Sequence, residues 1–118
     1  MQTSTQTLSP AIKNTLEKNF ATVVADLKNV IEVQVFLRDF LTETERAIFI
    51  KRLGIAVLLH AGKSYEEIQK TLGVSSATVS TVMEMVEKKG VQLALKKIAD
   101  DQWAEKWSSK ISGLFSAK

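Results

Sequence analysis

The chain has 118 residues, of which 45% are hydrophobic and 25% are charged, values typical of a globular protein and not of a disordered one. It contains no cysteine, which excludes disulfides, thiolate metal sites and thiol nucleophiles. Its formal net charge of +3 is mildly basic and by itself only weakly favours a polyanionic partner.

One proline and five glycines permit long helices and disfavour a fold rich in tight turns, so we expect one all-helical domain over residues 9–118. Residues 1–8 are small and polar, and we expect a disordered tail there. The longest apolar run, IAVLLHA, is far shorter than the ~20 residues that cross a bilayer, and the polar N-terminus does not resemble a signal peptide. We therefore expect a cytoplasmic protein without a membrane partner.

The first predicted helix starts at Ser9, which can cap it, and Pro10, which suits the first helical position. We expect it to run to about Val30, because apolar residues recur at three- and four-residue steps and share one face. This face is longer than one small subunit easily buries, which favours a homodimer. It comprises Ile12, Leu16, Phe20, Val23, Leu27 and Val30, widened by Val24 and Ile31.

A short amphipathic helix is predicted next, in the segment VQVFLRDFL, which ends at Leu41. Thr42 and Glu45 then form the sequence pattern of a capping box, in which each side chain accepts from the other residue's backbone N–H. They open a long helix that is expected to end at Gly62, where a left-handed conformation is easily adopted.

The same pattern repeats immediately afterwards. Ser64 and Glu67 form a second capping box and open a two-turn helix that Gly73 is expected to end. Ser75 can then cap a longer helix reaching Gly90. Two short helices joined by a tight turn with a glycine are typical of a helix-turn-helix, whose second helix is sized to enter a major groove.

The region after Gly90 completes a fold of about six helices. We expect Asp100-Asp101 to start a further helix, since acidic groups suit a helix N-terminus. Trp103 and Trp107 lie four residues apart and are expected to be core or dimer-interface anchors.

The predicted helix-turn-helix, residues 64–89, carries small hydroxyl side chains near the start of its second helix. Such side chains allow close approach to DNA and can bond to phosphates or base edges, and nearby lysines can contact phosphates. The candidate DNA-binding residues are Ser75, Ser76, Thr78, Ser80, Thr81, Lys63 and Lys70.

The segment LGVSSATVSTV, preceded by RLGIAVLLHAGKSYEEIQKT, resembles the DNA-binding region of the tryptophan repressor family. The family's pattern is a long helix with a glycine stop, a short capped helix ending in Leu-Gly, and a recognition helix reading ATIT or ATIS, here Ala77-Thr78-Val79-Ser80. The resemblance extends from Thr42 to about Val86. It implies an intertwined helical homodimer whose two reading heads meet successive major grooves of a palindromic operator in double-stranded DNA.

The resemblance also implies where an effector would bind. In the family's tryptophan site, the ligand is held by an arginine of the long helix and by an arginine, followed by glycine, of the recognition helix. Arg52 matches the first arginine and is the candidate effector-binding residue, while a surface ion pair with Glu45 or another acid stays open as the alternative role of its side chain. At the second position this chain has Thr81 followed by Val82, so we do not expect tryptophan to be the effector. The sequence identifies no other small molecule.

Residues 63–89, which we call the reading head, carry a balanced charge, whereas a DNA-binding protein normally has an excess of basic residues there. A second interpretation therefore stays open, in which the helix-turn-helix is only a scaffold and the apolar helices bind a partner protein. Four lysines, Lys63, Lys70, Lys88 and Lys89, are matched by four glutamates, Glu66, Glu67, Glu84 and Glu87.

No pattern of residues predicts catalysis. The chain lacks a glycine-rich phosphate loop and a nucleophile beside a base, and its single histidine does not favour a metal site. We therefore expect no enzyme activity, metal or cofactor. The function expected from the sequence is that of a sequence-specific DNA-binding transcriptional regulator, acting as a repressor.

Overall fold

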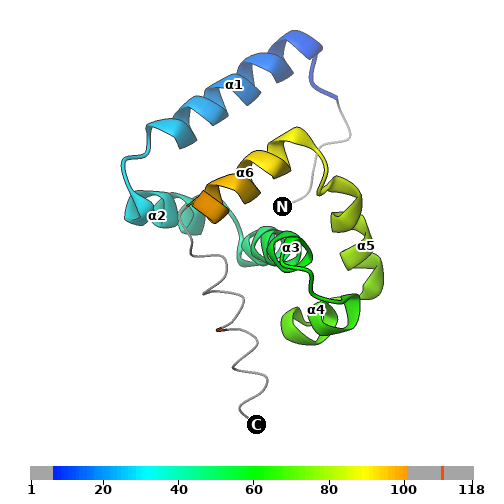
Figure 1. The fold of residues 1–118 in the computed structure, drawn as a ribbon. Coiled ribbons are helices and arrows are strands. Elements are labelled where there is room, and N and C mark those ends of the chain that lie inside the picture. The colour runs from blue at the N-terminus through cyan, green and yellow to red at the C-terminus, as the bar shows by residue number, and fades with distance from the viewer. Residues whose placement is uncertain (1–6, 101–109, 111–118) are drawn as a thin grey trace. The chain divides into compact units, whose positions relative to one another are not determined.

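The computed structural model describes residues 7–100 and Lys110, and these residues form six α-helices and no strand (Figure 1). The chain divides into two compact units, an N-terminal unit, Met1–Arg46, and a C-terminal unit, Ala47–Lys118. The predicted all-helical fold is confirmed. In chain order the helices are α1 (Pro10–Asp26), α2 (Val30–Phe40), α3 (Glu43–His60), α4 (Tyr65–Leu72), α5 (Ser76–Met85) and α6 (Lys89–Asp100).

The start of α1 is confirmed and its end is not. The Ser9 side chain accepts from the backbone N–H of Ile12 at 3.3 Å, and Pro10 lies in the first turn. The helix ends at Asp26 instead of about Val30. The reason is a second cap, because the Asn29 side chain accepts from the backbone N–H of Glu32 at 3.0 Å and starts α2.

The described part of the N-terminal unit contains no fully buried apolar side chain. Phe20, Phe36 and Phe40 contact one another, with ring centroids 5.0 to 6.2 Å apart. None of the described residues 7–46 is buried, however, and the side of α1 that carries Leu16 and Phe20 is about half exposed. A continuous apolar face of this kind marks an interaction surface.

The predicted capping box at the start of α3 is confirmed. The Thr42 N–H donates to Glu45 Oε1 at 2.8 Å, and the Glu45 N–H donates to Thr42 Oγ1 at 3.1 Å. The bond from the Thr42 backbone, followed by that from its side chain, holds the pKa of Glu45 below its ordinary value. This cap is therefore fully formed above the ordinary pKa of a glutamate and weakens as the pH falls through the lowered pKa.

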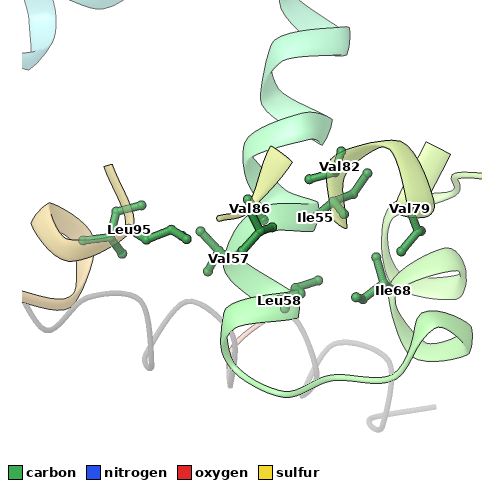
Figure 2. Packing of buried hydrophobic residues seen from close by; sticks show 10 residues of the cluster. Ile55, Val57, Leu58, Ile68, Val79, Val82, Val86 and Leu95 are labelled. Carbon is green, nitrogen blue, oxygen red and sulfur yellow. The ribbon is translucent and has the colours of Figure 1, made fainter. Parts of the chain in front are cut away.

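The C-terminal unit has a core to which all of its described helices contribute. Figure 2 shows Ile55 and Leu58 of α3, Ile68 of α4, and Val79 and Val82 of α5 pointing toward one another. These five side chains are the largest that are fully buried. The α3 residues Gly54–Leu58 are all buried, although the sequence alone gives no single inward stripe there. The rest of the core comprises Val86, Leu95 and Ile98.

The glycines at the ends of α3 and α4 are left-handed as predicted, with φ of 84° at Gly62 and 63° at Gly73. The prediction for Gly90 is wrong, because α5 ends at Met85 and Gly90 lies in the first turn of α6. Asp100 belongs to α6 and is the last residue of this helix that the structure describes. The predicted helix with Trp103 and Trp107, and most of the predicted disordered tail, lie outside the described residues.

We expect truncation of Ile68 to destabilise the C-terminal unit. Ile68 is fully buried between α3 and α5, so Ile68→Ala leaves a cavity that costs about 3 kcal/mol of the free energy of unfolding, whereas Ile68→Val costs about 1 kcal/mol. Urea unfolding followed by circular dichroism, at one protein concentration, measures both. Equal midpoints for Ile68→Ala and the unmodified protein would contradict the packing in Figure 2.

Candidate nucleic-acid interface

The helix-turn-helix is built by local hydrogen bonds at both ends of its turn. The Ser64 side chain accepts from the Glu67 N–H at 3.2 Å and opens α4, in the predicted capping box. At the other end of α4, the N–H of left-handed Gly73 donates to the Gln69 carbonyl at 2.9 Å. Ser75 then accepts from the Thr78 N–H at 3.1 Å and opens α5 after a turn of only three residues.

The core of the C-terminal unit fixes which side of α5 faces outward. Val79 and Val82 are buried against α3 and α4, which places Ala77 on the opposite side of the helix. Ser80 and Thr81 lie on either side of Ala77, and all three are exposed. We call Ala77, Ser80 and Thr81 the reading face. A surface of such small side chains lets a helix backbone come close to the floor of a major groove.

The predicted DNA-binding hydroxyls differ in their hydrogen bonds. Ser75 Oγ and Thr78 Oγ1 lie 3.0 Å apart and bond to each other, and Thr81 Oγ1 donates to the Ala77 carbonyl at 3.0 Å. The hydroxyls of Ser76 and Ser80 form no bond to any described residue. Two hydroxyls on α5 are therefore available to a ligand without breaking an internal bond.

The two predicted phosphate-contacting lysines lie in different surroundings. Lys63, in the loop between α3 and α4, is partly exposed and its side chain has no ion pair with a described acid. Lys70 Nζ lies 3.2 Å from Glu66 Oε1, one helical turn earlier on α4, with both side chains largely exposed. An exposed pair of this kind contributes little to stability, but it offsets the charge that Lys70 offers to a phosphate.

We expect Glu66→Gln to raise DNA affinity about threefold to tenfold at low salt. The change removes one negative charge beside Lys70 and so strengthens attraction to phosphates. Fluorescence anisotropy with a labelled duplex measures the gain, which should shrink as salt rises. Glu17→Gln, which removes the same charge from α1, is the matched control. A gain of equal size in both variants would mean that net charge, and not the Glu66–Lys70 pair, sets the affinity.

A groove of about 340 Å³ lies between α3 and the first half of α5. Arg52, the predicted effector residue, lines it together with Lys51 and Ile48 of α3. Thr78 and Thr81 line it on the α5 side, so both threonines border the groove as well as the outer surface. The groove combines two cations and hydroxyl groups with apolar walls from Ile48, Val74 and Val82.

A family model described as Trp repressor protein matches residues 14–98, which include α2 to α5 and most of α1 and α6. The chain belongs to the Trp repressor family. Membership of this family indicates a helix-turn-helix DNA-binding regulator and not an enzyme. No curated protein and no solved structure matches the chain. Among the helices of the described residues, none is long and apolar enough to cross a membrane.

The groove is lined by the three residues that the resemblance aligns with the family's tryptophan site, and one of the two arginines of that site is present. Arg52 lines it, and Thr81 and Val82 stand where the resemblance places an arginine and a glycine. Sequence reasoning did not single out Lys51 as a lining residue, because adjacent residues of a helix ordinarily face different directions. It also did not single out Ile48, which the four-residue spacing from Arg52 could have identified. Glu84, which the sequence analysis counted only in the charge balance, is an exposed acid one helical turn beyond Ser80.

Proposed function

We propose that this Trp repressor family member is a sequence-specific DNA-binding transcriptional regulator that represses by occupying a palindromic operator. The observation that carries the proposal is the reading face of α5, exposed, free of bulky side chains and held by the Gly73 turn. Ser76, Ser80 and Thr81 contact bases, Ser75 and Thr78 lie near a phosphate at the helix start, and Lys63 and Lys70 contact the backbone.

The proposal includes an intertwined homodimer acting in the cytoplasm. It is supported by the N-terminal unit, whose described residues are all at least partly exposed although α1 carries a long apolar face. A second copy that covers this face also supplies the second reading head that a palindromic operator needs. The half-sites are then about one helical turn of DNA apart.

An effector is proposed for the groove beside Arg52. Two cationic side chains, Arg52 and Lys51, with nearby hydroxyls favour a small molecule that carries an anionic group. Thr81 cannot replace the guanidinium of the family's second arginine, so tryptophan should not change DNA affinity. Binding measured with and without tryptophan tests this; a tryptophan-dependent gain would contradict it.

A second candidate function is supported by the balanced charge of the reading head and by Glu84 on its exposed side. In that case the helix-turn-helix is a scaffold, and the apolar face of α1 binds another protein. Such a module forms no specific complex with DNA at any salt concentration.

The deciding experiment is selection from a random duplex DNA pool with the full-length protein at moderate salt, with light scattering for mass. The proposed function predicts a two-fold-symmetric enriched site, a dimer mass and an affinity that falls steeply as salt rises. Recovery of unselected DNA only would reject it and favour the scaffold interpretation.

A further inference from the structure

The chemistry of the reading face indicates which base it can recognise. Ala77, at its centre, offers only a methyl group. Thr81 lies one helical turn later, and its hydroxyl donates to the Ala77 carbonyl at 3.0 Å. The methyl group of Thr81, on the other branch of the side chain, is therefore free to make an apolar contact. The middle of the face therefore presents two methyl groups side by side.

Ser80 lies next to these methyl groups and has the opposite character. Its side chain is exposed and its hydroxyl has no bond to a described residue, so it can donate to a ligand at no internal cost. The pattern is thus an apolar patch with one hydrogen-bond donor beside it.

The major-groove edge of thymine matches this pattern. Thymine is the base with a methyl group at C5, and its O4 acceptor lies beside that methyl. Guanine and adenine are read best by long bidentate side chains, arginine or lysine for guanine and asparagine or glutamine for adenine, and the reading face has none of these.

We infer that α5 reads a thymine in each half-site, with the methyl groups of Ala77 and Thr81 against the thymine methyl and the Ser80 hydroxyl donating to O4. This inference deepens the proposed function and rests on it. It assigns separate roles to two hydroxyl residues, an apolar contact for Thr81 and a hydrogen bond for Ser80.

The experiment replaces the thymines of the duplex enriched from the random pool, one position at a time, by uracil, which lacks the methyl and keeps O4. At one thymine of each half-site, this replacement should weaken binding about fourfold when one half-site is changed and roughly fifteenfold when both are changed. Thr81→Ser removes the protein methyl but keeps the hydroxyl that bonds to Ala77. It should weaken binding to thymine DNA by a similar factor and have little further effect on uracil DNA.

Thr81→Val is the matched control, since it keeps a methyl group and should stay sensitive to uracil. Circular dichroism establishes that both variants fold. If uracil at every thymine leaves affinity unchanged while the enriched duplex still outcompetes a scrambled one, the thymine inference is wrong and the proposed function stands. If no duplex is enriched, the proposed function fails and this inference with it.

Discussion

Ala77→Glu should lower the affinity for the selected operator at least about 100-fold without unfolding the protein. Ala77 is exposed and faces directly away from the buried Val79 and Val82, so a longer side chain there meets no part of the core. In the groove of DNA the new carboxylate lies close to phosphates in both half-sites. Like-charge contacts of this kind cost several kcal/mol, and ~3 kcal/mol corresponds to about 100-fold. Anisotropy titration and thermal unfolding measure the two effects.

Two controls separate the possible causes of this loss. Ala77→Gln has the same length without the charge and should lose much less affinity. Ala94→Glu makes the same change on an exposed residue of α6 and should bind like the unmodified protein apart from a small effect of net charge. Equal losses in Ala77→Glu and Ala94→Glu would mean that α5 does not present Ala77 to DNA.

The helix starts and the turn could be predicted because their determinants are local. The side chains of Ser9, Thr42 and Ser64 each accept from a backbone N–H three residues later, and a sequence displays such spacings directly. Gly73 is similar, since a left-handed residue after a short helix is favoured by glycine whatever the tertiary context. The start of α4, the turn and the start of α5 therefore follow from the sequence, whereas the end of α5 does not.

The errors arose where one local signal competed with another. The apolar pattern of α1 continues to Val30, but Asn29 caps α2 and interrupts the helix, so hydrogen bonding prevails over periodicity. Gly90 was expected to end a helix, yet it has an ordinary helical conformation in the first turn of α6. A glycine permits a left-handed conformation but does not require one.

The candidate site was less predictable than the fold. Composition identifies the hydroxyl residues of α5, but only the packing of Val79 and Val82 tells which of them face outward and which border the groove. The bonds from Ser75 to Thr78 and from Thr81 to Ala77, and the pairing of Lys70 with Glu66, depend on side-chain rotamers that a sequence does not fix.

Leu16→Asp should dissociate the proposed dimer, with dimerisation weakened at least about 1,000-fold. Leu16 is 51% exposed in the single chain and lies in the middle of the apolar face of α1. A dimer in which two copies cover this face therefore buries residue 16 of both subunits. An unpaired carboxylate buried in an interface costs roughly 3 to 5 kcal/mol, and here the cost is incurred in both subunits. Light scattering over a range of protein concentrations measures the change in mass.

Asn14→Asp is the matched control for this variant, because it places the same carboxylate on the opposite side of α1, away from the apolar face. It should stay dimeric, and Leu16→Ala should fall between the two, since it removes apolar contact area without adding a charge. Because one reading head makes only half of the phosphate contacts, the Leu16→Asp monomer should also bind a two-half-site duplex with a shallower dependence on salt. A Leu16→Asp protein that keeps the mass and the salt dependence of the unmodified chain would place the dimer contact elsewhere.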